Sequence, residues 1–487
     1  MMNTHFALYC TLTLMAGSAA VLNPFTNNAA PVRFSAPVDR MAVADLATQN
    51  LHRAMELADS AFTHYFTGEG MAMARFYDPY TGDHSQEKGS VWMYTAAIEA
   101  TNAILHALQT HNPNNQSQLY NAHTTRYRDQ LARLYDNLAY YRGTFELTSF
   151  TQTSEWSVYG VHRATTKGRA QVAGKENVYD DQQWLVRELL HSYKLTGEPR
   201  YLEEAEYLTA YVLDGWDCTL NASGKEHGGI PWGPGYTTKH ACSNGPFISP
   251  LVWLHEHYAD SDEEITHRYI TPDGSRKATV VKKSDYYLQF AEKVYAWQKA
   301  HLLRPDGVYD DFMGGGGKIR YEKVDGVPYR AHTPLHQQVG PPYSYNAGSP
   351  LSGAVDLYRV TGKPEYLDDA KQLADDSFRY FAKPSDQLTG YYEFKVKGFN
   401  NWFNGVLMRA YMEAYPIYRG AEPYLHPFQQ NLDYGYTHFL HRGILPPDLL
   451  NGWTDDRRVE GMFAFTFAAQ YALLSEYALS LTSSYVF

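Results

Sequence analysis

The stretch YKLTGEPRYLEEA at residues 193–205 occurs a second time, with few changes, as YRVTGKPEYLDDA at residues 358–370. In each copy a helical segment ends at Thr-Gly, a pair that suits a helix C-terminus, and Pro stands just inside the start of the next helix. A Tyr-Leu pair then supplies apolar side chains for packing. The repeat therefore predicts two copies of one helical hairpin within the same chain.

The helical period of apolar residues extends over most of the chain. Apolar residues recur three and four positions apart, as Leu185, Leu189 and Tyr193 do, in twelve segments. These segments are 41–66, 89–110, 118–141, 180–195, 200–213, 246–258, 284–302, 348–360, 364–381, 400–416, 424–441 and 458–481. Strands do not alternate with them, which excludes a parallel α/β sheet.

Twelve helices and a repeated hairpin together predict an all-α fold of the (α/α)6 barrel type. Six helical hairpins would form an inner and an outer ring, and the loops at one end would form a cleft. A superhelical solenoid is the alternative, although solenoids usually repeat more regularly. Two β-hairpins are expected to decorate the loops, at 269–281 and 319–331, each turning at Asp-Gly. The segment 143–177 has no helical pattern and is expected to be a long, functional or disordered loop.

The N-terminal residues have the character of a targeting segment. An apolar run within residues 1–20 ends in small residues, although no Lys or Arg precedes it. We expect a signal peptide cleaved after Ala20, a leader segment at 21–40, and a single (α/α)6 domain at 41–487. The protein would then be secreted, periplasmic or held at the cell surface. No stretch is long enough to span a bilayer.

Composition and motifs exclude several classes of partner. The net charge is −11 and no long basic run occurs, so nucleic acid is not an expected partner. Phosphate-loop, dinucleotide and nucleophile-elbow motifs are absent from the sequence, and we expect no cofactor. His255 and His257 stand two positions apart on a helix and face different directions, so no metal site is expected there. The 41 Tyr, 22 Phe and 9 Trp residues suit contact with sugars or a Tyr-rich helical core.

The tetrapeptide VYDD occurs at 178–181 and again at 308–311. In the first copy Asp180 is expected to be a helix N-cap, with Gln183 completing a capping box. Two neighbouring carboxyl groups are also what glycoside hydrolysis commonly requires. The helix N-terminus favours one ionised carboxylate, and mutual repulsion raises the pKa of the other. The same residues can therefore begin a helix and carry out catalysis.

Four sequence segments, in order along the chain, add to the interpretation that Asp180 and Asp181 are catalytic. They are ENVYDDQQWLVRELLHSYKLTGEPRYLEEAEYL at 176–208, GGIPWGPGYTTKHACSNGP at 228–246, YSYNAGSPLSGAVDLYRVTGKPEYLDDA at 343–370 and, more loosely, NWFNGVLMRAY at 401–411. These blocks resemble glycoside hydrolase family 76, the endo-α-1,6-mannanase family. The last block lacks the Lys expected before its Gly. The matches cover about half of the chain, and the family's (α/α)6 fold agrees with the count of twelve helices.

The resemblance implies a retaining endo-α-1,6-mannanase that cleaves the backbone of α-mannan through a covalent glycosyl-enzyme intermediate. It implies that Asp180 is the nucleophile and Asp181 the general acid/base, a distinction that the local sequence does not make. The expected substrate is an α-mannan polysaccharide or oligosaccharide. We expect the protein to act as a monomer.

Five further residues are candidates for substrate binding. Trp232 would offer a platform for a sugar ring, unless it is an ordinary buried tryptophan. Asn244 would bond sugar hydroxyls, unless Asn-Gly is only a turn. Tyr345 and Asn346 would precede a helix and line the cleft, with an N-cap as the alternative for Asn346. Asp310 of the second VYDD precedes four glycines and would contact substrate, unless it lies in a solvated turn.

The sequence leaves two alternative functions and one possible disulfide bond undecided. Another (α/α)6 enzyme, a sugar epimerase or an unsaturated-glycuronyl hydrolase, would need His-based chemistry or differently spaced carboxylates. A non-catalytic glycan-binding relative would keep the aromatic cleft, but the presence of both Asp180 and Asp181 argues against it. Endo or exo action is not distinguished by the residues. Cys218 and Cys242 are compatible with a disulfide or with two free buried thiols.

Overall fold

The computed structural model describes residues 40–482, and the residues from Arg40 onward form one compact unit. The predicted signal peptide and all but the last residue of the predicted leader lie outside the described residues. Each of the twelve segments with a helical period contains one helix, so the mostly helical fold is confirmed. The helices are α1 (Arg40–Tyr65), α2 (Val91–Thr110), α3 (Gln118–Leu138), α4 (Tyr179–Thr196), α5 (Pro199–Asp214), α6 (Ile248–His257), α7 (Lys283–Leu302), α8 (Ser344–Thr361), α9 (Pro364–Phe381), α10 (Asn400–Ala414), α11 (Glu422–Phe439) and α12 (Gly461–Thr482).

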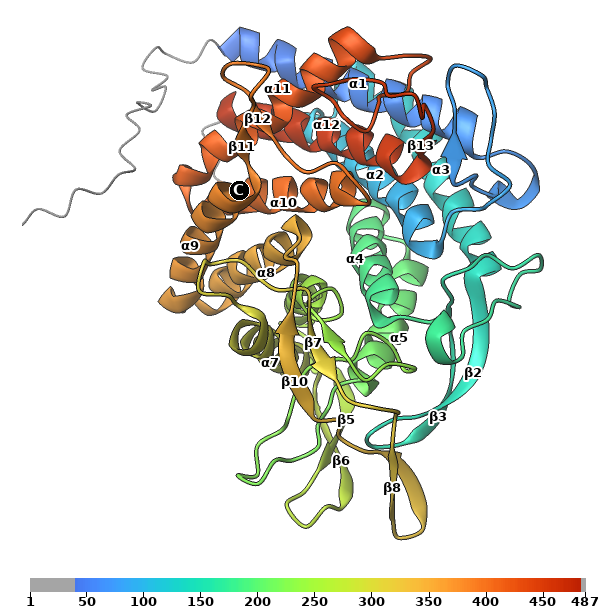
Figure 1. Cartoon of the computed structure of the whole chain (residues 1–487), viewed down its shortest axis with the longest axis vertical. Helices are drawn as coiled ribbons and strands as arrows, with labels where there is room; N and C mark the ends of the chain where they lie inside the picture. The colour runs from blue at the N-terminus through green and yellow to red at the C-terminus, as the bar shows by residue number, and fades with distance from the viewer. Residues whose placement is uncertain (1–39, 483–487) are drawn as a thin grey trace, which may run out of the picture. The chain divides into compact units, whose positions relative to one another are not determined.

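The even-numbered helices pack against one another in a closed cycle, from α2 through α4, α6, α8 and α10 to α12, which packs against α2 again. Each odd-numbered helix packs on a neighbour in this cycle, and α1 packs along α12, as Figure 1 shows for the two ends of the described chain. The helices of the cycle are buried on most sides, and α12 is apolar around nearly its whole circumference, as a helix inside a core must be. Helices α3, α9 and α11 bury one face only.

The repeated hairpin corresponds to the pairs α4–α5 and α8–α9. Gly197 ends α4 in the left-handed conformation (φ 72°), and its N–H donates to the Tyr193 carbonyl. Gly362 ends α8 in the same way (φ 65°), with its N–H on the Tyr358 carbonyl. Because Pro residues occupy the first turns of α5 and α9, the predicted mechanics of both hairpins are confirmed.

Short antiparallel strands lie between the helices. The predicted hairpins are present as β5–β6 (Glu264–Ile270 and Arg276–Lys282) and β8–β9 (Tyr321–Val324 and Val327–Arg330). The segment 143–177 is not only a loop, because β2–β3 (Arg142–Thr148 and Thr153–Tyr159) forms a further hairpin there. In Figure 1 these three hairpins gather in the lower part of the view.

A three-stranded sheet that the sequence pattern did not predict is also present, and its strands are β10 (Leu335–Val339), β7 (Phe312–Gly315) and β4 (Lys239–His240). Two small ribbons complete the strands within residues 40–482. These are β1–β13 (Phe76–Tyr77 and Val459–Glu460) and β11–β12 (Lys383–Pro384 and Tyr392–Glu393).

Two helix starts differ from prediction. Helix α4 begins at Tyr179, Val178 is its N-cap, and no side chain caps it. The predicted capping box is therefore wrong: Tyr179 N–H donates to the Trp232 carbonyl at 2.8 Å, and the Gln183 amide donates to the Ser243 carbonyl. A neighbouring loop, rather than Asp180, supplies these acceptors. Helix α8 begins at Ser344, so Tyr345 and Asn346 lie in its first turn instead of before it.

Two further expectations concern the membrane and the cysteines. Within residues 40–482 no helix has the length and apolar character needed to cross a bilayer. Cys218 and Cys242 are both buried and both free, so the disulfide alternative is not realised in this structure.

Candidate active site

A cleft with a volume of about 800 Å³ lies at the N-terminal ends of several helices of the inner cycle. Its lining includes the first turns of α2, α4, α8 and α10, together with the loop that precedes β4. The volume falls within the range of roughly 300–1,000 Å³ that is usual for ligand pockets. Asp180, Asp181, Trp232 and Tyr345 of the predicted site all line this cleft.

Asp180 and Asp181 are the second and third residues of α4. Asp181 is buried and Asp180 half-buried, and both line the cleft beside Trp184. Their position in the first turn places them near the positive end of the helix dipole, which favours a negative charge. Adjacent residues on a helix point in different directions, so the two carboxyl groups reach different parts of the cleft.

Burial raises the pKa of both carboxyl groups, but not equally. For Asp181 burial is the largest cause, and the charge of Asp180 raises its pKa further, to well above the ordinary value. For Asp180 burial is partly offset by the Cys242 thiol and the Trp232 indole, although Nε1 of Trp232 completes no hydrogen bond. Asp180 is therefore the group that ionises first, and Asp181 keeps its proton to higher pH.

The glycine-rich block positions the indole of Trp232 next to this pair. A side chain at Gly233 would collide with the Asn177 carbonyl, because the loop passes directly over the residues that precede α4. The Trp232 ring stacks on His240 at 4.6 Å, and His240 stacks on Phe312 at 4.6 Å. Burial lowers the pKa of His240 to about 3, so this wall of the cleft carries no positive charge at neutral pH.

Asn244 is not among the residues that line the cleft. It is fully buried, and its amide holds the glycine-rich loop in place. Its Nδ2 donates to the carbonyls of Ile230 (3.0 Å) and His240 (2.8 Å), and its Oδ1 accepts from Ile230 N–H (2.9 Å). These bonds leave the amide no free group for a sugar, so its contact with substrate would be indirect.

Aromatic rings from four helices form the other walls. The ring of Trp402 meets those of Trp92 (5.1 Å) and Trp184 (4.7 Å) edge to face. Tyr345 stacks on Phe403 at 4.2 Å. Flat apolar rings with polar edges suit the alternating faces and hydroxyls of a pyranose.

Beneath this aromatic surface lies a buried ionic network between α2, α4 and α10. The Trp402 indole donates to Glu99 (3.2 Å), which also binds the Arg409 guanidinium. Arg187 is ion-paired with Glu188 at 2.7 Å, and Asn102 donates to Glu188 at 2.9 Å. The network joins the floor of the cleft to three helices of the cycle.

The second VYDD divides its two carboxylates between two environments. Asp310 is buried and paired with Arg304 at 3.0 Å, and it is not among the residues that line the cleft. Its neighbour Asp311 does line the cleft and accepts a hydrogen bond from Asn346 at 3.2 Å. Burial raises the pKa of Asp311 to about 6. Asn346 itself is fully buried, and its Oδ1 has no hydrogen-bond partner.

One group of side chains has the composition of a metal site. The possible ligand atoms of Asp217, His227 and His332 lie within 4.8 Å of one another. The ammonium group of Lys239 lies 2.8 Å from Asp217 Oδ2, which places a fixed positive charge among them. The two imidazole rings are stacked in parallel planes 3.5 Å apart, so their in-plane lone pairs cannot converge on one ion. The group is a buried ion pair flanked by imidazoles.

Several cleft residues were missed by reasoning from the sequence. They are Trp92, Trp184, His240, Cys242, Asp311, Tyr343, Phe399, Trp402 and Phe403. The high aromatic content was the only signal for most of them, and it does not separate core from cleft. For Asp311 the signal was present in the second VYDD, but the prediction chose its neighbour Asp310 as the residue that contacts substrate.

A cycle of helix pairs with two neighbouring carboxyl groups in an aromatic cleft is the architecture of a carbohydrate-active enzyme. The model of glycosyl hydrolase family 76 matches residues 93–257 and 274–430. The chain belongs to this family and is a glycoside hydrolase. A comparison with curated proteins found no sequence match.

Solved structures share the fold at low sequence identity. The family 76 glycoside hydrolase (mannosidase) Bt3792 from Bacteroides thetaiotaomicron is 22% identical with a TM-score of 0.63, over 88% of this chain and 98% of that chain. An inactive variant of the α-1,6-mannanase GH76A from Salegentibacter, with two adjacent aspartates replaced by asparagine and α-1,6-mannotriose bound, is 19% identical with a TM-score of 0.55, over 89% and 100%. A D-mannose isomerase is 12% identical with a TM-score of 0.53, over 90% and 99%. The same fold therefore carries more than one chemistry.

Proposed function

We propose that this chain is a retaining endo-α-1,6-mannanase that hydrolyses the backbone of α-mannan. The observation that carries the proposal is the pair Asp180 and Asp181, a half-buried and a buried carboxyl group of unequal pKa at a helix N-terminus inside an aromatic cleft. We also propose that the cycle of helix pairs is an (α/α)6 barrel. Export to the cell surface, the periplasm or the medium remains a proposal that rests on residues 1–20.

The proposed reaction has two steps. In the first, Asp180 attacks the anomeric carbon while Asp181 gives its proton to the departing glycosidic oxygen, which breaks the C–O bond and forms a glycosyl ester. In the second, Asp181 removes a proton from water, and the water oxygen displaces Asp180 from the anomeric carbon. The more acidic group is thus the nucleophile, and the group that holds its proton longer is the acid, as such a pair requires.

Two observations support this proposal over an isomerase on the same fold. A sugar isomerase or epimerase of this fold would need His-based proton transfer. Two imidazoles line the cleft: His240 is stacked between two rings and has a strongly lowered pKa, and His162 is 77% exposed and lies 4.0 Å from Glu176. The Salegentibacter α-1,6-mannanase carries adjacent aspartates among the residues replaced in its inactive variant, which parallels the pair proposed here.

The stereochemical outcome tests the mechanism. We expect linear α-1,6-mannan to release products whose first-formed anomer is α, because two displacements at one carbon retain its configuration. Proton NMR during the first minutes of digestion distinguishes the α anomer from the β anomer before mutarotation. Oligosaccharides of several lengths, rather than mannose alone, would appear early if the action is endo. An initial β anomer would contradict the double displacement.

Asp311 and Asp310 form a matched pair for testing substrate contact. We expect Asp311→Asn to raise KM or lower kcat/KM on mannan by about 10–100-fold, as loss of a charged hydrogen bond of roughly 1.5–3 kcal/mol predicts. Asp310→Asn should leave both constants within about threefold of the parent, because Asp310 faces Arg304 and not the cleft. Steady-state kinetics on α-1,6-mannan checks both variants. Equal losses in the two variants would argue against a direct role for Asp311.

A further inference from the structure

A second cavity lies apart from the cleft, between α5, α7, strand β5 and the turn that joins β2 to β3. We call it the β5 pocket; its volume is about 360 Å³. Aromatic side chains provide much of its wall, and these are Trp156, Trp216, Tyr286 and Phe290. The β5 pocket and the catalytic cleft have no lining residue in common.

Polar groups without partners point to a ligand in the β5 pocket. Asp214 Oδ1 accepts hydrogen bonds from Ser149 (2.9 Å) and Gln152 (3.0 Å), whereas its Oδ2 is buried and has none. The indole Nε1 of Trp156 is also buried and completes no hydrogen bond, although it lies near enough to Asp214 to lower the pKa of that carboxyl, and the residue as a whole is 9% exposed. A buried polar atom left unpaired costs roughly 1–3 kcal/mol, so a hydroxyl that bonded both atoms would be stabilised there.

Strand β5 lines one side of the pocket with residues 264–268. Within residues 40–482 it pairs with β6 alone, in a two-stranded sheet, so no described strand bonds the backbone groups on its other edge. The side chain of Arg268 on this strand lines the pocket and is exposed, and its charge lowers the pKa of Asp214. The pocket thus combines aromatic walls with an acceptor, an indole donor, a guanidinium and a strand edge. Aromatic rings and mixed donors and acceptors suit a neutral polyhydroxyl ligand.

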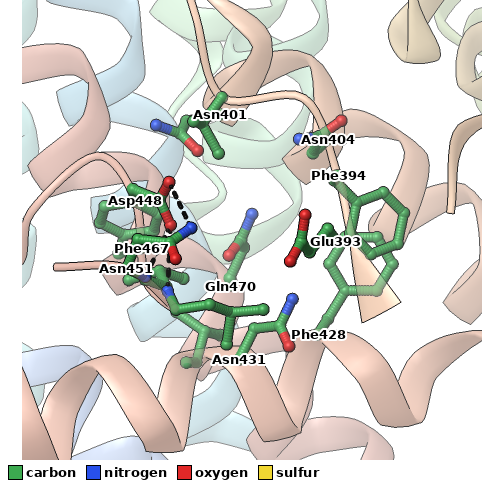
Figure 2. A pocket seen from close by; sticks show the side chains of 14 residues that line it. Glu393, Phe394, Asn401, Asn404, Phe428, Asn431, Asp448, Asn451, Phe467 and Gln470 are labelled. Carbon is green, nitrogen blue, oxygen red and sulfur yellow. Dashed lines mark hydrogen bonds between the residues drawn. The ribbon is translucent and has the colours of Figure 1, made fainter. Parts of the chain in front are cut away.

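Volume distinguishes the β5 pocket from another polar hollow in the same unit. Figure 2 shows that hollow, with Asn401, Asn404, Asn431 and Gln470 around it. Its volume is only about 60 Å³, far below the roughly 300 Å³ at which ligand pockets usually begin, and it is of a size for a few water molecules. The β5 pocket exceeds that threshold.

The aromatic layer between the two sites separates them physically. Tyr179, which precedes Asp180, packs on Tyr211 at 5.1 Å, and Tyr211 packs on Trp156 at 5.4 Å. A ligand in the β5 pocket therefore lies behind the start of α4 and outside the reach of the catalytic carboxyl groups. Binding there holds a sugar without cleaving it.

We propose that the β5 pocket is a second, non-catalytic binding site for a pyranose unit of the mannan substrate. A second site on one chain would keep a polymer attached between cleavage events, because the second binding event becomes intramolecular. The identity of the sugar rests on the proposed function.

Isothermal titration with α-1,6-mannotriose tests the site. The Asp180→Asn/Asp181→Asn variant of the whole chain serves as parent, so that the ligand is not cleaved. We expect two trisaccharides per chain in the parent and one after Ala210→Trp, since Ala210 lines the β5 pocket and a larger ring would fill it. Arg268→Ala should weaken the second site about tenfold. Lys277→Ala, an exposed cation on the partner strand outside the lining, is the matched control and should change nothing.

The outcomes separate this proposal from the proposed function. In the active chain, Ala210→Trp should leave kcat/KM on mannotetraose unchanged, which also shows that it folds, and should slow hydrolysis of long mannan severalfold. A single binding site in the parent, or two sites that persist after Ala210→Trp, would overturn the inference. If the chain with both Asp180 and Asp181 unchanged leaves α-1,6-mannan intact, the proposed function is overturned instead. In that case, loss of trisaccharide binding on Ala210→Trp would still support the β5 pocket as a binding site.

Discussion

Asp180→Asn is expected to lower kcat/KM on α-1,6-mannan by about 10⁴-fold or more, because it removes the nucleophile of the proposed double displacement. Asp181→Asn is expected to lower it by about 10²–10⁴-fold, the usual contribution of a general acid. Both measurements use initial rates of reducing-end release from linear mannan. Full activity in either variant would contradict the catalytic assignment.

The two aspartates are distinguished by the leaving group. A dinitrophenyl α-mannoside departs without protonation, so Asp181→Asn should form its glycosyl ester at a rate near that of the parent chain. Asp180→Asn should remain inactive on the same substrate, because the attacking carboxylate is missing. A burst of dinitrophenol in a stopped-flow spectrometer reports the first step. The reverse pattern would exchange the two roles.

Proton linkage supplies a control for folding. A buried Asp with a raised pKa binds more protons in the folded than in the unfolded state at intermediate pH, so the free energy of unfolding falls as pH rises through that window. Asp181 has such a pKa. Asp181→Asn should therefore be at least as stable as the parent at pH 7, by thermal unfolding, and should lose the alkaline limb of the kcat/KM profile.

The second large effect is expected in the ionic network beneath the cleft. Arg409 is buried, pairs with Glu99, and lies among Glu188 and Glu413. Arg409→Met leaves the half-buried Glu99 without the cation that pairs with it, and breaking a buried pair in this way typically costs about 3–5 kcal/mol. We expect Tm to fall by roughly 6 °C or more at 2 °C per kcal/mol. Since Glu99 also holds the Trp402 indole, the affinity for mannan should fall as well.

Arg458→Met is the matched control for this loss. Arg458 pairs with Asp456, and the two side chains are 60% and 61% exposed. Removing an exposed pair costs about 1 kcal/mol or less. Adding Glu99→Met to Arg409→Met should recover part of the lost stability, because no unpaired charge then remains. Equal losses in the two single variants would show that the network carries no special stability.

Much of the fold was predictable from local pattern. The apolar periods identified all twelve helices, and Thr-Gly followed by Pro identified the turns of the repeated hairpin, because these features act between residues a few positions apart. The pair Asp180 and Asp181 was also evident, since both residues stand in one short motif. The ordered blocks then associated the pair with a reaction.

What the sequence could not decide depends on contacts between distant segments. Asp310 and Asp311 are neighbours in the sequence, and successive residues of an extended chain face opposite sides. Which of them faces the cleft is set by the pairing of β7 with β4 and β10, whose strands come from three separate parts of the chain. Asn244 likewise stabilises the glycine-rich loop because the fold brings the backbone of Ile230 and His240 within hydrogen-bond distance of its amide. Local sequence therefore determined the helices and placed the Asp180–Asp181 pair at the start of α4, and tertiary packing alone decided which side chains surround them.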